Sequence, residues 1–410
     1  MKKPRVLYIS STYSRDEKDN QNPWMIDTIG RLGEAGHEIE VLAPAYKGLR
    51  SHVVGGVTVH RFRYFFAGRE TLTHDQGAPN KIRGSVLFKL LFFPYLFFGT
   101  LAAMRVARRG RYDFIHCHWP FPHGLMGWAA CLAAPGRPRL ILHFHGACLL
   151  LAAKFKPIAP LLRFCLRRAH GVVSNSSFTA ALVENLMPAL PVKQWIIAFG
   201  SPLSGDPLPP ARNAVKVILT VGRVVERKGI IYLLRALPKI AAAVDVKVAI
   251  VGKGDPKVEA DLRRVTEELR LGDRVVFAGK VPEADLIRWY QGCDVFCLPA
   301  IVDSQGETEG LGVVLLEALN YARPVAASKV GGIPDIIRHG RTGLLFPEKD
   351  PDALADAILE LLRDPERAER LGRQGREMVE KEFSWEHVVS QWEMFYHEAR
   401  AFKRGSFKRV

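Results

Sequence analysis

The chain of 410 residues is too long for a single ordinary core, so we expect two domains. Hydrophobic residues make up 48% and charged residues 24%, an ordinary composition for a globular protein. The formal net charge is +16; residues 1–205 hold 26 basic against 11 acidic residues, whereas residues 206–410 hold 32 against 31. The positive excess of the first half favours an anionic partner: a nucleic acid, a membrane surface or a phosphorylated substrate.

The first half alternates short apolar runs with helical patterns. Its opening run, "RVLYIS" at 5–10, predicts a strand and is too short for a signal peptide. A helix is expected at 24–35, where Gly36 ends it. Further strands are predicted at 38–44, 113–119, 139–146 and 171–177. This alternation predicts a parallel sheet covered by helices on both faces.

Two segments of this basic half are unusually apolar. The first, "GSVLFKLLFFPYLFFGTLAAMRVARRGR" (84–111), has about twenty apolar residues and then four arginines, which is long enough to be considered as a membrane span. Lys89 and Pro94 interrupt it, so a helix in the membrane interface or a core helix with a basic end fits better. Residues 149–171 have the same character. Both interpretations stay open: core helices with solvated basic ends, or a peripheral surface for anionic lipid head groups. No nucleic-acid partner is expected, because no binding signature accompanies the charge.

The stretch "GSPLSGDPLPPAR" (200–212) predicts a linker, after which the pattern restarts. Strands are expected at 215–223, 246–255, 274–281, 294–300 and 324–332. We therefore predict an α/β chain with two tandem doubly wound, Rossmann-like domains, at 1–205 and 206–384. Because ligands bind at the carboxyl ends of parallel strands, a central cleft between the two domains is the expected site.

The remaining features bear on the C-terminus and on the compartment. Residues 385–410 begin with a helix that carries an aromatic stripe, which we expect to be core packing, and this helix would return to the first domain. The six cysteines have neither CxxC pairs nor disulfide-like spacing. They predict reduced thiols in a cytoplasmic protein.

Two glycine-containing turns follow strands of the second half. In "VGRVVERKG" (221–229), Gly222 permits a close turn, and Arg223 and Lys228 follow it beside a helix start. Such a place suits a diphosphate, because arginine forks onto phosphate oxygens and lysine supplies a compact charge; two surface cations remain the alternative. The turn "VGKGD" (251–255) matches neither GxGxxG nor a Walker sequence and is weak by itself.

The stretch "ETEGLGVVLLEAL" (307–319) places Glu309 and Glu317 around Gly310 and Gly312. A retaining hydrolase needs its two carboxyl groups about 5 Å apart. Eight residues of helix rise about 12 Å, so the two glutamates are better interpreted as holding two parts of one elongated ligand. The glycines would let the backbone approach that ligand closely.

Histidines gather at two strand ends of the first half: His116, His118, His123, His143 and His145. Strand-end histidines are able to ligate zinc, but only Asp113 accompanies them, and we predict that there is no metal site. His116 and His118 alternate along one strand. They are candidates for acceptor binding, with a structural role as the alternative.

Taken in order, "HFHG", "VGRVVERKG", "VGKGD", "ETEGLGVVLLEAL" and "PVAASKVGGIPDIIRHGRTGLLF" resemble the retaining glycosyltransferases of family 4. These are two-domain GT-B enzymes that use nucleotide sugars. The resemblance covers almost the whole chain and is strongest over residues 215–350. It implies that Arg223 and Lys228 hold the donor diphosphate, that Glu309 and His145 meet the donor sugar, and that Glu317 binds the ribose hydroxyls. The catalytic residues it implies are His145, Arg223, Lys228 and Glu309. The donor-binding residues it implies are Gly222, Arg223, Lys228, Gly252, Val281, Glu309, Gly310, Leu311, Gly312 and Glu317.

Two departures from the family pattern are visible. The first loop, "SSTYSRDEKDNQNPW" (10–24), has no glycine, which puts phosphate contact from it in doubt and suggests a mobile loop on the acceptor side. The stretch "IIAFGSPLSG" (196–205) replaces an "NGVD"-like turn.

The sequence thus predicts a retaining, metal-independent glycosyltransferase without cofactors. It would use a nucleotide sugar and a lipid-linked or saccharide acceptor, at the inner face of the cell membrane with its anionic surface. The alternatives are a soluble transferase or nucleotide-sugar epimerase on the same fold, and a non-catalytic nucleotide-sugar-binding protein.

Overall fold

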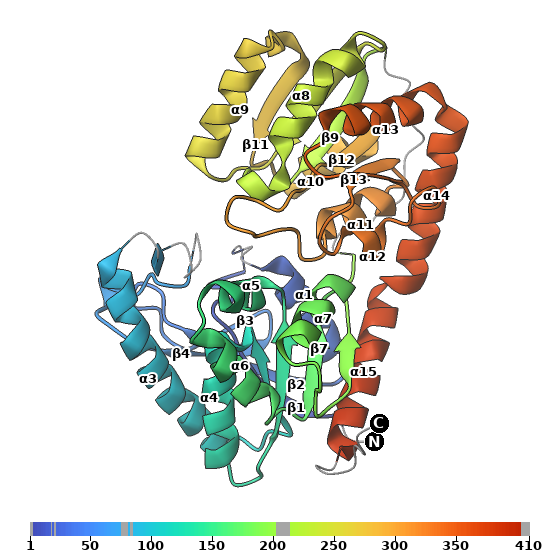
Figure 1. Ribbon diagram of the computed structural model, residues 1–410. Coiled ribbons are helices and arrows are strands. Elements are labelled where there is room, and N and C mark those ends of the chain that lie inside the picture. Colours follow the sequence, from blue (N-terminus) through green and yellow to red (C-terminus); the bar gives the residue numbers. More distant parts are fainter. Residues whose placement is uncertain are drawn as a thin grey trace. The chain divides into compact units, whose positions relative to one another are not determined.

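The computed structural model describes residues 3–17, 19, 22–74, 81–82, 85–201 and 214–402, which form two compact units. Unit 1 comprises the chain up to Ala198 and again from Val388 onward, and unit 2 runs from Phe199 to His387. The predicted domain boundary at 205/206 and most of the predicted linker lie outside the described residues. The helices and strands of the two units are labelled in Figure 1.

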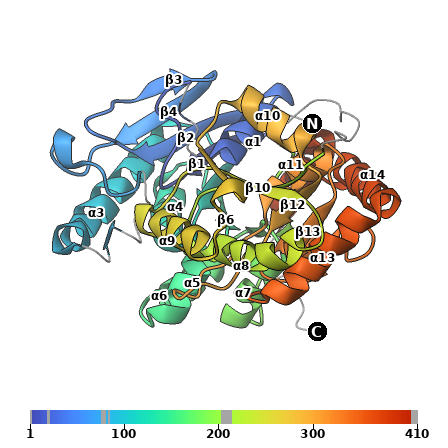
Figure 2. The same ribbon diagram turned by 90° about the horizontal axis from the view of Figure 1, so that it is seen from above.

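Unit 1 is built on an eight-stranded sheet in the order β3-β4-β2-β1-β5-β6-β7-β8. All neighbours pair in parallel except β3, which runs antiparallel to β4 at the outer edge of the sheet (Figure 2). The strands are β1 (Arg5–Ile9), β2 (Glu38–Pro44), β3 (His52–Val54), β4 (Val57–Phe62), β5 (Phe114–His118), β6 (Arg139–Phe144), β7 (Gly171–Ser174) and β8 (Gln194–Ile196).

Helices cover both faces of this sheet. They are α1 (Pro23–Glu34), η1 (Ala67–Arg69), α3 (Val86–Arg109), α4 (Pro120–Ala133), α5 (Ala147–Lys154), α6 (Ile158–Leu166), α7 (Ser177–Leu186) and, from Val388 onward, α15 (Trp385–Ala401). One face packs Ile115 and Cys117 of β5 against α3, α4 and α6. On the other face, Tyr396 of α15 contacts Tyr8 of β1 and His116 of β5. The alternation of side chains along β5 thus divides the core between the two helix layers.

Unit 2 contains a six-stranded, wholly parallel sheet in the order β11-β10-β9-β12-β13-β14. Its strands are β9 (Lys216–Val221), β10 (Val246–Val251), β11 (Val275–Gly279), β12 (Val295–Leu298), β13 (Val325–Ser328) and β14 (Leu344–Phe346). The strand order reverses direction beside β9, and in such sheets ligands bind at the carboxyl ends near that point.

The helices of unit 2 are η2 (Glu226–Lys228), α8 (Ile230–Ala241), α9 (Pro256–Glu268), η3 (Gly272–Arg274), α10 (Glu283–Gly292), α11 (Val313–Asn320), α12 (Ile333–Ile336), α13 (Pro351–Arg363) and α14 (Pro365–Glu382). The apolar stripes of α8, α9 and α13 join one face of the sheet in a single core. On the opposite face, Tyr290 of α10 packs on Phe296 of β12, with ring centroids 5.6 Å apart.

The predicted α/β fold with two doubly wound sheets is confirmed. The aromatic stripe near the C-terminus is core packing as expected, because Trp392, Phe395 and Tyr396 are all buried. The sequence did not reveal the hairpin β3–β4, so the expectation of a purely parallel first sheet was wrong at this edge. Two-residue turns and three-residue strands carry too little periodicity to be detected.

Candidate functional site

Three neighbouring strands of unit 2 end in glycines. Gly222, Gly252 and Gly279 follow or end β9, β10 and β11, and all have positive φ angles. The Gly222 N–H donates to the Val251 carbonyl (2.9 Å), and the Gly252 N–H donates to the Gly279 carbonyl (2.8 Å). A Cβ atom on Gly252 would lie 1.9 Å from the Gly222 carbonyl oxygen. Glycine is therefore required at Gly252, where the ends of neighbouring strands lie in close backbone contact at the carboxyl edge of the sheet.

Lys228 and Glu309 form an ion pair beside this edge. The Lys228 Nζ lies 2.6 Å from Glu309 Oε2, and the two side chains are only 10% and 15% exposed. Lys228 extends across Gly222, where an added Cβ would lie 3.2 Å from the Lys228 Cε. The turn η2 positions this lysine, because the Lys228 and Gly229 N–H groups donate to the Val225 and Glu226 carbonyls.

The electrostatics of the pair favour an ionised glutamate. Burial acts to raise the pKa of Glu309, but the charge and hydrogen bond of Lys228 and the charges of Arg227 and Arg223 outweigh it, so that the pKa is lowered. Arg223 itself has an exposed side chain directly after β9. The site thus combines a buried lysine, an exposed arginine and one carboxylate.

The loop that carries Glu309 leads into the N-terminus of α11. Gly312 precedes the helix with a φ of 93°, a left-handed conformation that favours glycine, and Leu311 beside it is buried. The loop is held from behind by Gly331 and Gly332: the Gly332 N–H donates to the Glu309 carbonyl (3.0 Å). A Cβ atom on Gly331 would lie 2.1 Å from that same oxygen. No role for these two glycines was predicted from the sequence, although they are adjacent in "VGG" (330–332).

Glu317 lies one turn further along α11 and has a partner that sequence reasoning missed. The Tyr290 hydroxyl donates to Glu317 Oε2 at 2.5 Å. Burial raises the pKa of Glu317, and this hydrogen bond opposes the rise. Tyr290 lies in α10, 27 residues upstream, so no local pattern joins the two side chains. Val281 follows β11 between Gly279 and α10, on the same edge of the sheet as Gly252.

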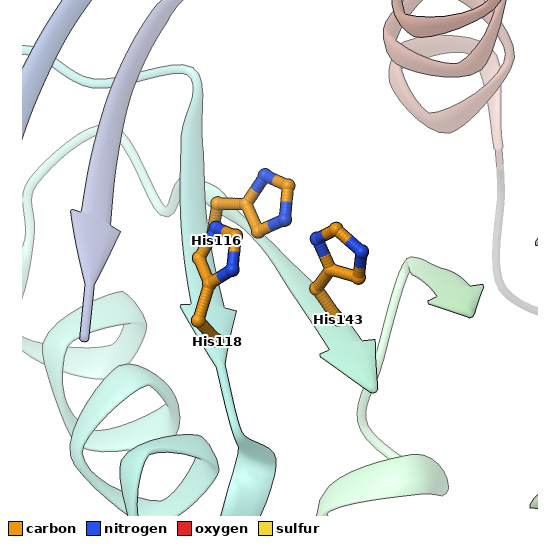
Figure 3. A group of neighbouring side chains, drawn as sticks. All are labelled: His116, His118 and His143. Carbon is orange, nitrogen blue, oxygen red and sulfur yellow. The ribbon is translucent and has the colours of Figure 1, made fainter. Parts of the chain in front are cut away.

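The first-unit histidines form a separate, buried group. His116 and His118 lie on β5, and His143 pairs with His118 in register on β6 (Figure 3). The His118 Nδ1 and His145 Nε2 atoms are 3.0 Å apart. His116 Nδ1 lies 2.9 Å from the hydroxyl of Tyr396, a buried residue of α15. This contact favours a structural role for His116 over acceptor binding. His145 is flanked by the rings of Trp24 and Trp119, with centroids 4.8 and 5.1 Å away.

Burial keeps these histidines neutral. It lowers the pKa of His116 and of His145 to about 3 each, and it lowers the pKa values of His118 and His143 well below the usual value for histidine. One ring nitrogen from each of His116, His118 and His143 lies within 4.8 Å of the others. Zinc with bonds of 2.0–2.1 Å holds tetrahedral nitrogen ligands about 3.4 Å apart, and no carboxylate belongs to this described group. The three histidines would have to close in to hold a metal ion.

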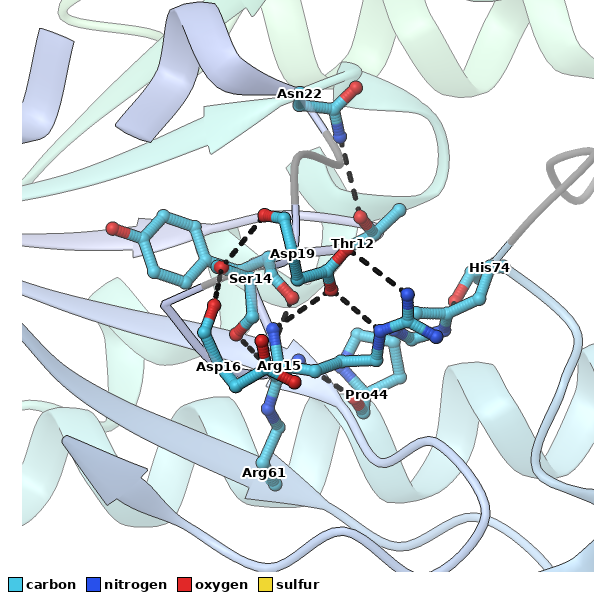
Figure 4. A network of polar contacts seen from close by, with 11 residues as sticks. Thr12, Ser14, Arg15, Asp16, Asp19, Asn22, Pro44, Arg61 and His74 are labelled. Carbon is cyan, nitrogen blue, oxygen red and sulfur yellow. Dashed lines mark hydrogen bonds and ion pairs between the residues drawn. The ribbon is translucent and has the colours of Figure 1, made fainter. Parts of the chain in front are cut away.

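The described part of the glycine-free first loop is tied to the sheet (Figure 4). The buried Arg61 of β4 donates to the carbonyls of Tyr13 (2.9 Å) and Ser14 (2.6 Å), and Arg15 pairs with Asp19 at 2.6 Å. Asn22 donates to the Thr12 hydroxyl at 3.3 Å. Two charges of the loop, those of Arg15 and Asp19, are thus paired with each other, and the mobile loop on the acceptor side stays a prediction.

The structure therefore brings the predicted donor-side residues of unit 2 to one edge of its sheet. These are Gly222, Arg223, Lys228, Gly252, Val281, Glu309, Gly310, Leu311, Gly312 and Glu317. His116, His118 and His145 gather in unit 1.

Comparisons with known proteins relate the chain to glycosyltransferases. A family model described as "Glycosyl transferases group 1" matches residues 209–378, and one described as "Glycosyl transferase 4-like domain" matches residues 27–198. The chain is 27% identical over 301 residues to an N-acetyl-alpha-D-glucosaminyl L-malate synthase of Bacillus anthracis, covering 72% of this chain and 76% of that protein. It is 37% identical over 238 residues to a GDP-mannose-dependent alpha-(1-6)-phosphatidylinositol monomannoside mannosyltransferase of Mycolicibacterium smegmatis, covering 55% of this chain and 59% of the relative. The match thus spans little more than half the length of that mannosyltransferase.

Solved structures share the fold. Sucrose-phosphate synthase from Thermosynechococcus elongatus superposes with a TM-score of 0.74 at 23% identity, covering 97% of this chain and all of that one. HepE of Anabaena, in complex with UDP and glucose, superposes with a TM-score of 0.70 at 16% identity, covering 95% and 98%. At these identities the likeness concerns the fold alone.

Proposed function

Because the chain belongs to the glycosyltransferases of the family 4 kind, which have the GT-B fold, we propose that it is a retaining and metal-independent enzyme. It moves a sugar from a nucleotide-sugar donor to a hydroxyl group of a lipid-linked or polysaccharide-precursor acceptor. The observation that supports this best is the Lys228–Glu309 ion pair at 2.6 Å on the glycine-lined edge of the second sheet.

The difficult step in such a transfer is the departure of the nucleotide diphosphate while positive charge develops on the sugar. The exposed Arg223 offers a planar fork for phosphate oxygens, and Lys228 offers a compact charge that is already held in place by Glu309. The backbone N–H groups at the start of α11 add the partial positive charge of a helix N-terminus. Charges fixed in advance stabilise the leaving group without any metal ion.

The two glutamates bind opposite ends of the donor. Glu309 stays ionised beside Lys228 and accepts hydrogen bonds from the donor sugar. Glu317, oriented by the Tyr290 hydroxyl, accepts from the ribose hydroxyls. His145 meets the donor sugar as a neutral ring, since burial lowers its pKa to about 3, and it is able to donate or accept a hydrogen bond without adding charge.

The acceptor side rests on unit 1. The mannosyltransferase relative is named for a phosphatidylinositol monomannoside, which supports a lipid acceptor for this chain. The helix α3 is apolar and long enough to cross a membrane by length and composition, and only 22% of its apolar window is buried against the protein. This exposed apolar surface supports contact with lipid. We place the protein at the inner face of the cell membrane as a peripheral protein of the cytoplasm.

A thermal-shift screen with UDP-, GDP- and ADP-sugars tests the donor site. We expect one nucleotide sugar to raise the melting temperature of the wild-type protein and not that of a Lys228→Ala variant. Transfer is then measured with the donor that binds, using membrane lipid extracts as acceptor. If no nucleotide sugar raises the melting temperature, the proposed transferase function fails. A donor that binds but is neither transferred nor hydrolysed would favour a non-catalytic binding protein.

A further inference from the structure

The helix α3 has two opposite faces of different character. Its buried residues Leu91, Tyr95, Gly99, Ala103 and Ala107 recur every four positions. This face packs on α4: the Tyr95 hydroxyl lies 2.8 Å from His123 Nε2, and a Cβ on Gly99 would lie 2.7 Å from Met126 Cε. Because α3 is fixed along one side to unit 1, it lies on the protein and does not leave it to cross a bilayer.

The other face of α3 is apolar and exposed. A position two residues after a buried one is turned by about 200° around the helix axis and so points the other way. Phe93, Phe97 and Leu101 stand in this relation to the buried residues and, with Val86 and Leu90, are between 47% and 69% exposed. We call these five residues the apolar stripe of α3. An exposed apolar surface of this kind marks an interaction site.

The same face continues into two arginines. Arg105 and Arg109 stand two positions after the buried Ala103 and Ala107, so they follow the apolar stripe toward the C-terminal end of α3. Both are exposed, and within the described parts of the chain no hydrogen bond or ion pair is recorded for either side chain. The positive charge here is therefore available to a partner.

A groove of about 670 Å³ opens beside these arginines, between α3 and the strands β2 and β4. Its walls combine Arg105 and Arg109 with the exposed rim residues Phe98 and Leu101. Arg5, Arg61 and Arg63 line its other side, so that five arginines face one acid among the described lining residues.

That acid, Glu40, is already fully engaged inside the groove. Its Oε1 accepts a hydrogen bond from Arg5 (2.5 Å), and its Oε2 accepts one from the Tyr112 hydroxyl (2.8 Å) and lies 2.6 Å from His60 Nε2. Arg63 pairs with Glu70 at 2.7 Å. The Arg61 guanidinium donates to the backbone carbonyls of Pro44, Tyr13 and Ser14. Of the groove's five arginines, Arg105 and Arg109 are therefore the two whose guanidinium groups are open to an anion at its mouth.

We propose that this groove binds the phosphate head group of an anionic membrane lipid while the apolar stripe of α3 lies in the lipid interface. Two arginines one helical turn apart suit a phosphate, onto which guanidinium groups fork. Phenylalanine and leucine side chains at this exposure enter the boundary between head groups and acyl chains. The inference rests on the membrane location proposed above but not on the transfer reaction.

Flotation of the full-length protein with phosphatidylcholine vesicles, with and without phosphatidylglycerol, tests the proposal. Wild-type protein should float with the anionic vesicles at low salt and bind more weakly as salt rises. The double variant Arg105→Gln/Arg109→Gln should bind them about thirtyfold more weakly, since each basic residue at an anionic surface contributes a factor of about five. A matched pair in unit 2, Arg370→Gln/Arg373→Gln, removes the same charge from another exposed helix and should float like the wild type.

The apolar stripe is tested separately with the double variant Phe93→Ala/Phe97→Ala. This variant should bind anionic vesicles more weakly, and the salt dependence of its binding should be unchanged. The inference is overturned if the Arg105/Arg109 variant floats like the wild type, or if the Arg370/Arg373 pair loses as much binding. The melting temperature of every variant is also measured with and without the donor nucleotide sugar. Vesicle binding without any donor-induced shift would support this surface while refuting the proposed transferase function, so the two failures are distinguishable.

Discussion

Replacing Lys228 by alanine removes the cation that joins the donor edge to Glu309. The hydrogen bond of a lysine to a charged group contributes about 1.5–3 kcal/mol, so we expect donor affinity to fall by about 10- to 150-fold. Loss of a fixed charge that stabilises the leaving group should lower kcat by a further factor of about 100 to 1,000. Because the two side chains keep 10% and 15% exposure, the loss of folding stability should stay below the roughly 3–5 kcal/mol of a fully buried pair.

The assay combines donor titration calorimetry, initial rates and urea denaturation on four proteins: the wild type, Lys228→Ala, Glu309→Ala and the double variant. If the two side chains act as a pair, their effects on stability should be smaller together than their sum. Lys239→Ala, an exposed lysine of the same unit paired with Asp356, is the matched control and should leave donor binding unchanged. Unchanged donor affinity and turnover in Lys228→Ala would refute the diphosphate role.

Two further predictions concern the same edge of the sheet. Gly252→Ala places a Cβ 1.9 Å from the Gly222 carbonyl oxygen at a φ of 137°, so it should lower the melting temperature of unit 2 by several degrees. The control Gly272→Ala meets nothing within 4 Å and should leave the melting temperature unchanged. Equal melting temperatures of the two variants would contradict the close approach at Gly252. Glu309 has a pKa lowered in the folded protein, so its stabilising contribution is present above the ordinary glutamate pKa of about 4.3 and is lost as the pH falls through the lower, folded value. Denaturation at a series of acidic pH values should therefore show the wild type losing its advantage over Glu309→Gln only in that acid range, and a constant difference would argue against an ionised Glu309.

The elements and the glycine-lined strand ends were predictable because they have local signals. Apolar runs of five or six residues followed by glycine mark β9 and β10, and the pattern of Gly310 and Gly312 marks the start of α11. The partners across these elements were not predictable. Lys228 was predicted to bind the donor diphosphate, but its ion pair with Glu309 was not predicted. The two residues are 81 positions apart in the chain, and no spacing rule joins them.

Charge alone also does not reveal the partners of the first loop. Residues 10–24 look solvated in the sequence because acids and bases alternate there. In the structure Arg15 is satisfied by Asp19, and Arg61 reaches into the loop from β4, 46 positions after Arg15. The polarity of a segment does not reveal whether its partners lie in water or in the protein.

The contact between Gly331–Gly332 and the Glu309 carbonyl has a consequence for redesign. Two loops that follow different strands, β12 and β13, are in direct backbone contact at Glu309 and Gly331–Gly332. Anyone who transplants the segment 307–312 from another protein to alter which sugar is used would need to move residues 329–332 with it. The two loops should therefore be exchanged together. A graft of either loop alone would contact a neighbouring loop whose backbone does not fit it.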